Sequence, residues 1–201
     1  MEPGQRKEMI LEKAKKLFAA QGYYQTQISD IIREAGVARG TIYQYFKNKE
    51  DVFISLLEKY YGKWEKDAYL AGDLDLATIS PREYLFHRIR RTLSFFADDQ
   101  DVCRIYLRMG LGLPGELEAI IRRFEKKIED IIVNDLRLGV RNGHIPEDLD
   151  VTLTANLMGG ALLRIAYLYF ATDENADLDL DLLARKISAI LGPGIFLPSA
   201  K

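Results

Sequence analysis

The side chains best suited to chemistry lie between residues 26 and 49, and the chemistry they suit is hydrogen bonding to DNA. Arg39 can donate two hydrogen bonds to a guanine edge, and Gln44 can pair with an adenine edge in the same groove. The methyl group of Thr41 suits a thymine methyl group. The remaining polar side chains suit phosphate oxygens, which fix position on DNA rather than sequence: Thr26, Gln27, Tyr43, Tyr45 and Lys49.

Two short helical patterns, joined by a tight turn, are expected to position these groups. Thr26 is predicted to cap the first helix. Gly36 stands where the turn requires positive φ, and Val37 fills the junction between the helices. The second helix is expected from Ala38 to Phe46, although alanine is a poor N-cap that costs about 1 kcal/mol relative to serine or threonine. This layout predicts a helix-turn-helix whose second helix enters a major groove.

Helical signals continue along the rest of the chain, and no segment alternates as a strand does. Ser80, followed by Pro81 at the first helical position and Glu83 at the third, is a strong start signal. The expected helices span residues 6–21, 26–35, 38–46, 49–64, 81–96, 101–110 and 116–142, then from Asp148 or Asp150 to residue 171, and from among Asp177, Asp179 and Asp181 to residue 191. We therefore predict an all-α fold of about nine helices, with a helix-turn-helix domain at residues 1–48 and a helical body at residues 49–201.

Charge is distributed unevenly along the 201 residues. Residues 1–49 contain nine Lys or Arg against five acids, a net +4, whereas the whole chain carries −2. A basic N-terminal block on an acidic body fits DNA contact confined to one end. The single cysteine, Cys103, excludes an intramolecular disulfide and suits a reducing compartment. No signal peptide is visible, and the longest apolar run, residues 155–171, is shorter than the ~20 residues of a membrane span, so we expect a cytoplasmic protein without membrane contact.

Motifs for catalysis or cofactor binding are weak. Gly110, Gly112 and Gly115 match the G-x-G-x-x-G spacing of dinucleotide sites, but a helical segment precedes them where that motif needs a strand. His87 and His144 are far apart and have no cysteines or carboxylates at metal-ligand spacing. The sequence therefore predicts neither an enzyme nor a metal or cofactor site.

Large, rigid side chains recur through the body and suit either a packed core or the wall of an apolar cavity. Such stripes are more often core than ligand site, so both interpretations stay open. The cavity hypothesis assigns an effector pocket to Trp64, Tyr84, Phe95, Phe96, Tyr106, Met109, Phe124 and Tyr167. The basic run at residues 82–91 is usually a solvated helix face, and the alternative is a site for the phosphate groups of a ligand.

A series of residues between positions 22 and 50 has the spacing of a known family. They are Gly22-Tyr23, Thr26, Ile31, Ala35-Gly36-Val37, Gly40-Thr41-Ile42-Tyr43, Tyr45-Phe46 and Lys49-Glu50. This pattern resembles the TetR/AcrR family of bacterial transcriptional regulators. The resemblance implies an all-α homodimer, usually a repressor, whose N-terminal helices bind DNA and whose C-terminal body binds a small effector. The DNA contacts that it implies are Gln27, Arg39, Gly40, Thr41, Tyr43, Gln44, Tyr45 and Lys49.

The resemblance also implies that the last two helices form the dimer interface. We expect this interface at Leu157, Gly160, Leu163, Leu183, Ile187 and Leu191. Because glycine inside a helix costs ~1 kcal/mol in propensity, Gly159 and Gly160 predict a close approach between helices. A dimer would present two recognition helices about 34–36 Å apart, so the operator is expected to be an inverted repeat.

The main hypothesis is a homodimeric repressor that a small apolar effector releases from a double-stranded DNA operator. The effector is expected to be an aromatic compound or a fatty acyl-CoA, with helix 49–64 linking the two sites. One alternative is a helical ligand carrier or enzyme-like protein with a vestigial helix-turn-helix, which a salt-dependent gel shift would distinguish. The other is an architectural DNA binder without an effector, which native mass spectrometry would distinguish by the lack of a retained small molecule.

Overall fold

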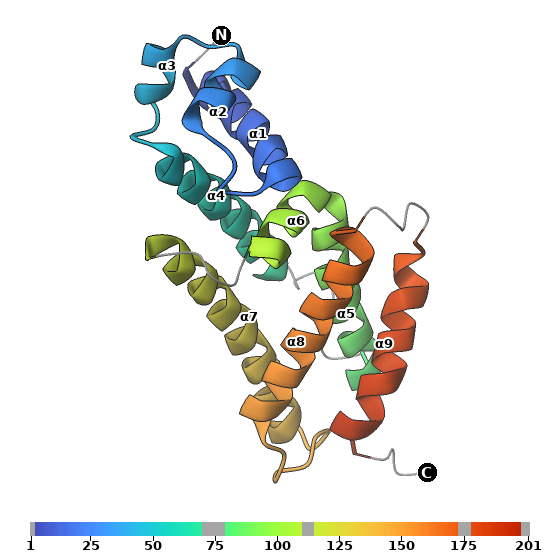
Figure 1. Ribbon diagram of the computed structural model, residues 1–201. Helices are drawn as coiled ribbons and strands as arrows, with labels where there is room; N and C mark the ends of the chain where they lie inside the picture. Colours follow the sequence, from blue (N-terminus) through green and yellow to red (C-terminus); the bar gives the residue numbers. More distant parts are fainter. Residues whose placement is uncertain (1–2, 70–78, 110–114, 173–177, 198–201) are drawn as a thin grey trace.

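The computed structural model describes residues 3–69, 79–109, 115–172 and 178–197, and these ranges contain nine helices and no strand. The helices are α1 (Pro3–Gln21), α2 (Ile28–Ala35), α3 (Arg39–Tyr43), α4 (Lys49–Tyr69), α5 (Pro81–Asp98), α6 (Gln100–Met109), α7 (Glu116–Arg141), α8 (Val151–Phe170) and α9 (Leu180–Ile195). The expected all-α fold class is thus confirmed. Figure 1 shows α1–α3 gathered at one end of the molecule, with α4 leading from them toward a body of α5–α9.

The N-terminal helices share a small core. Phe18, Ile31 and Ile42 are buried together with Phe53, because α1 packs against both α2 and α4. Gly36 takes the left-handed conformation, with φ of 63°, as the tight turn after α2 requires. This core holds α3 at the tip of the molecule, away from the body (Figure 1).

The start of α2 and the end of α3 differ from the sequence-based expectation. Gln27, not Thr26, is the N-cap of α2. Thr26 is fully buried, and its hydroxyl donates to the Gly22 carbonyl at 2.7 Å, because the chain folds back over the end of α1. α3 ends at Tyr43 rather than continuing to Phe46, which turns into the core.

α4 is a single helix that joins the N-terminal helices α1–α3 to the body (Figure 1). Asn48 caps it by accepting the Asp51 backbone N–H at 2.8 Å. The apolar stripe expected from the sequence is buried along the helix, at Phe53, Leu56, Leu57, Tyr60 and Trp64. With 21 residues, α4 is about 30 Å long at 1.5 Å per residue, and it reaches from α1–α3 to the near side of the body (Figure 1).

The body is arranged around α5 and α8. α5 packs along α9 and also against α8, α7 packs along α8, and α6 lies against α1 and α8. Ser80 starts α5 as expected, by accepting the Glu83 backbone N–H at 3.2 Å. α9 continues beyond the stop predicted before its proline and reaches Ile195. Pro193 is tolerated because it lies in the exposed last turn, while Ile195 is buried against the core.

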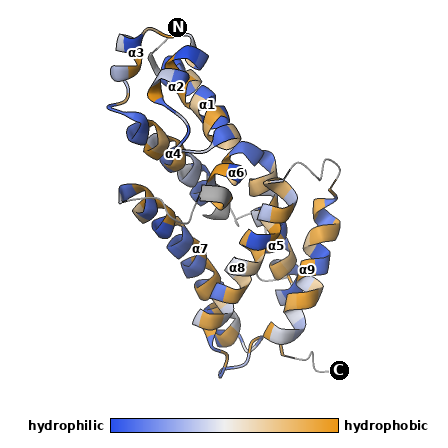
Figure 2. Ribbon diagram, viewed as in Figure 1, coloured by the Kyte–Doolittle hydropathy of each residue, from blue (hydrophilic) through white to orange (hydrophobic). Residues whose placement is uncertain are grey.

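α8 is strongly apolar and only partly covered. It runs for 20 residues from its Asp150 cap and is long and apolar enough to cross a membrane, whereas the sequence pattern predicted no such segment. It packs on three neighbouring helices of the body and carries the exposed Arg164. Yet 28% of its most apolar window is buried within the chain, and Figure 2 shows apolar residues along α8 and α9. A substantial apolar face of α8 therefore remains exposed.

Candidate DNA-binding surface and effector cavity

α3 presents polar side chains at the tip of the molecule while its apolar side is anchored in the core. The predicted DNA contacts that are exposed here are Arg39, Gly40, Tyr43 and Gln44, with Thr41 and Tyr45 half-buried. Ile42 and Phe46 are buried and fix the orientation of the helix. The Arg39 guanidinium carbon lies 6.0 Å from the centre of the Tyr43 ring, within cation–π distance. Of the predicted base-reading groups, Arg39 and Gln44 are therefore exposed at this end of the molecule and Thr41 is half-buried.

The other three predicted contacts have different environments. Thr26 is buried and its hydroxyl is bonded within the domain, so that hydroxyl is not open to a phosphate. Gln27 is exposed at the start of α2. Lys49 Nζ donates to the Tyr23 carbonyl at 2.8 Å and lies 4.2 Å from the centre of the Tyr23 ring. Burial lowers the pKa of Lys49. Lys49 therefore ties α4 to the loop between α1 and α2.

A cavity of about 410 Å³ lies inside the body between α5, α7 and α8. Most of its wall consists of aliphatic side chains, among them Ile89, Ile128, Ile132, Leu136, Met158 and Leu162. Trp64 of α4 and Phe196, directly after α9, also line the cavity. A Cβ on Gly139, near the end of α7, would lie 2.5 Å from the side chain of Ile145, so a larger residue there would require the Ile145 side chain to shift.

The cavity takes in part of the predicted pocket. The predicted residues that line it are Trp64, Tyr84 and Phe95. The wall does not include Phe96, Tyr106, Phe124 or Tyr167, and the side chain of Met109 lies outside the described residues. Tyr106 and Phe124 instead pack against each other with ring centres 5.2 Å apart. The aliphatic lining was missed because its helical spacing on α7 is the same as that of an ordinary core face.

A polar cluster interrupts the apolar wall, and it consists of Tyr84 and Arg88 from α5 with Asp135 from α7. Arg88 Nε and Nη2 donate to the two carboxylate oxygens of Asp135 at 2.9 and 3.1 Å. The Tyr84 hydroxyl donates to Asp135 at 3.0 Å. Burial, reinforced by the charge of Asp135, raises the pKa of Tyr84 to about 12, so this hydroxyl stays protonated at neutral pH.

The other basic side chains of residues 82–91 do not form one common site. Arg90 Nε donates to Asp181 of α9 at 2.6 Å, and Arg82 is exposed to solvent. Arg91 lines the cavity together with Arg88. The basic run is therefore divided between a solvated surface, a bridge to α9 and the cavity wall.

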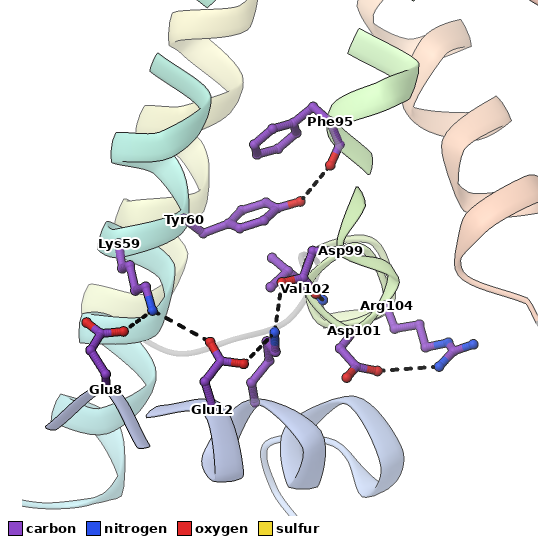
Figure 3. Close-up of polar contacts among 10 residues, drawn as sticks. Glu8, Glu12, Lys59, Tyr60, Phe95, Asp99, Asp101, Val102 and Arg104 are labelled. Carbon is purple, nitrogen blue, oxygen red and sulfur yellow. Dashed lines mark hydrogen bonds and ion pairs between the residues drawn. The ribbon is translucent and has the colours of Figure 1, made fainter. Parts of the chain in front are cut away.

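An ion-pair network joins α1 and α4 to the start of α6 (Figure 3). Lys15 Nζ lies 2.8 Å from carboxylate oxygens of both Asp99 and Glu12, and Lys59 of α4 pairs with Glu12 at 3.6 Å. Asp99 also accepts the Val102 backbone N–H at 3.2 Å and so caps α6. Burial disfavours the charged form of Lys15, but hydrogen bonds to Asp99 and Glu12 outweigh it and raise the pKa.

The cavity adjoins this network through the end of α5. Phe95 lines the cavity, and its carbonyl accepts a hydrogen bond from the Tyr60 hydroxyl of α4 at 3.4 Å (Figure 3). Asp99 follows Phe95 by about one helical turn. The end of α5 therefore carries a cavity residue, a contact with α4 at Phe95 and a contact with α1 at Asp99.

The outer face of α8 and α9 carries exposed apolar residues. They are Leu153, Leu157, Leu168, Leu182 and Ile190, of which Leu157 is 65% exposed and Ile190 is 77% exposed. Of the predicted interface residues, Leu157 and Gly160 are exposed, and Leu163, Leu183 and Leu191 are half-buried. Ile187 is buried, with 5% of its surface exposed. A Cβ on Gly160 would meet no atom of this chain within 4 Å, so nothing in the described protomer requires glycine there.

Comparison with known proteins agrees with this arrangement. Family models described as bacterial regulatory proteins of the tetR family and as a tetracyclin repressor-like C-terminal domain match residues 10–56 and 78–169. The fatty acid metabolism regulator protein of Bacillus subtilis (strain 168) is 30% identical over 190 residues, covering 92% of this chain and 93% of that protein.

Solved structures show the same similarity. FadR from Bacillus subtilis in complex with stearoyl-CoA is 30% identical, with a TM-score of 0.78 over 94% of this chain and 98% of that one. FadR from Bacillus halodurans is 27% identical, with a TM-score of 0.79 over 92% and 94% of the two chains. AibR in complex with isovaleryl coenzyme A and operator DNA shares the fold, with 23% identity and a TM-score of 0.75 over 94% and 98%. This chain belongs to the TetR family of bacterial transcriptional regulators, and it is a DNA-binding regulator of transcription.

Proposed function

We propose that this protein is a homodimeric repressor that binds an inverted-repeat operator and leaves it when a fatty acyl-CoA occupies the body. The observation that carries the proposal is the largely aliphatic cavity of about 410 Å³, which reaches from the far end of the body to Trp64 of α4. The comparisons support it, since a similar protein is named a fatty acid metabolism regulator and a similar solved structure contains stearoyl-CoA.

The composition of the wall favours an acyl chain over an aromatic compound. Aliphatic side chains from α5, α7 and α8 make up most of the lining, and the volume falls within the ~300–1,000 Å³ of small-molecule sites. Each methylene group transferred from water into such a wall contributes about 0.8 kcal/mol, roughly fourfold in affinity. Affinity is therefore expected to rise steeply with acyl chain length until the cavity is filled.

Occupancy of the cavity is expected to alter the DNA-binding end through two contacts. A chain that displaces Phe95 disturbs the hydrogen bond from Tyr60, which belongs to α4. The same displacement moves Asp99 and, with it, Lys15 of α1. To change operator occupancy from mostly bound to mostly free, the effector must prefer the released state by about 5 kcal/mol.

The exposed apolar face of α8 and α9 supports the dimer. Leu157 and Ile190 are large apolar residues in solvent, and a Cβ on Gly160, one helical turn after Leu157, would meet no atom of its own chain within 4 Å. Glycine at such a position costs ~1 kcal/mol in helix propensity, which close approach of a second copy would offset. Two copies related by a two-fold axis require an operator with the same symmetry.

Selection of bound sequences from a random DNA pool, followed by operator titration with a series of acyl-CoAs, tests the proposal. We expect an inverted repeat, a steep loss of affinity with salt, and weaker operator binding as the acyl chain lengthens. Free coenzyme A is the matched control, because it carries the phosphates without the chain. Asymmetric selected sites would contradict the dimer, and operator affinity that ignores every acyl-CoA would contradict the proposed effector.

A further inference from the structure

The polar cluster of Tyr84, Arg88 and Asp135 closes the side of the cavity between α5 and α7. These two helices each pack against α8 but hardly against each other, so side chains rather than backbone close this side. Arg88 reaches across the gap and bonds both oxygens of Asp135, with 23% and 26% of the two side chains exposed. A ligand in the cavity therefore meets a paired, charge-balanced wall here.

Charge balance decides which ligand group can lie against this wall. The guanidinium of Arg88 is always charged, but it is already bound to Asp135, which also accepts the Tyr84 hydroxyl. A ligand carboxylate at this place meets the like charge of Asp135 in a partly desolvated setting, which is unfavourable. A thioester or ester carbonyl brings no net charge and avoids this repulsion.

We propose, building on the acyl-CoA response proposed above, that Asp135 is a specificity-determining residue that makes the cavity accept acyl thioesters and esters, whose carbonyl group is uncharged, and reject free fatty acids. Asp135 acts through Arg88. Once the aspartate charge is removed, the guanidinium loses its carboxylate partner at the cavity wall and suits the carboxylate of a fatty acid. Arg91 and His144 also line the cavity, but they are the same in every variant below, so a changed preference reports on the pair.

Binding of lauroyl-CoA, methyl laurate and laurate tests this inference, with the fluorescence of Trp64 as the signal. Trp64 is the single tryptophan of the chain and lines the cavity, so its emission reports occupancy directly. In the wild-type protein, laurate should bind about tenfold or more weakly than methyl laurate. Asp135→Asn should raise the affinity for laurate relative to methyl laurate by about tenfold or more. Arg88→Gln should lower the same relative affinity below that of the wild-type protein.

Asp130→Asn is the matched control, because Asp130 lies on the exposed side of α7 and pairs with Lys126 at 3.1 Å. It removes the same charge from the same helix outside the cavity and should leave all three affinities unchanged. Thermal unfolding of each variant checks that it is folded. Arg88→Gln has the opposite expected sign, so it keeps the test decisive if Asp135→Asn unfolds.

The possible outcomes separate the two proposals. The role of Asp135 is overturned if the wild-type protein binds laurate and methyl laurate equally well, or if the ratio of these two affinities is unchanged in the two cavity variants. In either case, binding of lauroyl-CoA would leave the proposed function standing. If none of the three compounds changes Trp64 emission while the protein is folded, acyl binding fails, and the role of Asp135 fails with it.

Discussion

Replacing Lys15 with glutamine should weaken the link between effector binding and DNA release more than it weakens either event alone. Lys15 lies on α1, in the DNA-binding end, and its Nζ is 2.8 Å from Asp99, which caps α6 in the body. Glutamine keeps the length and polarity of the side chain but removes the charge. The substitution therefore acts on a contact that joins the two parts of the molecule.

The magnitude follows from the geometry and from solvent screening. Two unit charges 4 Å apart near a protein surface attract by roughly 4 kcal/mol before desolvation and side-chain entropy are subtracted. Measured values for exposed pairs are only about 0.2–1 kcal/mol. The Lys15 and Asp99 side chains are 12% and 26% exposed, so we expect the upper end of that range, about 1 kcal/mol. This corresponds to about a fivefold change in an equilibrium constant.

Operator affinity measured by fluorescence anisotropy, with and without saturating acyl-CoA, is the appropriate assay. The ratio of the two dissociation constants should fall about fivefold in Lys15→Gln. Lys13→Gln is the matched control, since Lys13 is nearby on the same helix but pairs at 3.2 Å with Glu34 of α2, inside the DNA-binding end. An unchanged ratio in Lys15→Gln, or an equal fall in Lys13→Gln, would refute the proposed transmission through Asp99.

Three further predictions concern the DNA-reading surface, the dimer and the polar cluster. Arg39→Ala should weaken operator binding by about 1–3 kcal/mol and relax the preference at one base position in a sequence selection; a uniform loss over all sequences would assign Arg39 to phosphate instead. Leu157→Arg should give folded monomers in sedimentation velocity, because it places a charge on the exposed apolar face, and a persistent dimer would locate the interface elsewhere. The pKa of Tyr84, raised from 10.0 to about 12, means that its protonated form contributes stability below pH 10 that is lost as the pH rises toward 12. Comparing the tyrosinate absorbance of wild type and Tyr84→Phe during an alkaline titration tests this, and ionisation of Tyr84 at its ordinary pKa would contradict it.

Features that depend on local physics could be predicted from the sequence. Gly36 takes the left-handed conformation and Ser80 caps α5, because each depends on a few neighbouring residues. The stripe of α4 is buried as expected, since helical spacing decides which side chains share a face. Thr26 shows the limit of such reasoning. Its pattern is that of an N-cap, but the chain path after α1 buries it, and Gln27 takes that place.

The residues around the proposed effector cavity could be predicted only in part. Core faces and cavity walls have the same apolar periodicity, so the sequence could not separate Phe95, which lines the cavity, from Phe96, which does not. The same holds for α8 and α9, where Ile187 is buried and Ile190 is exposed although both are apolar residues of one helix. Which side faces a neighbour depends on the angle at which two helices meet, and that angle is set by the whole body.

The sequence by itself determined the helical architecture, the helix-turn-helix and the family to which the chain belongs. These follow from residue spacing, helix caps and turn glycines, which act over a few residues. Tertiary structure alone decided that Arg88 meets Asp135 across the cavity, that Lys15 meets Asp99 between the two ends, and that Phe95 adjoins both the cavity and α4. Each of these contacts joins residues from different helices, and only the packing of the whole chain brings such residues together.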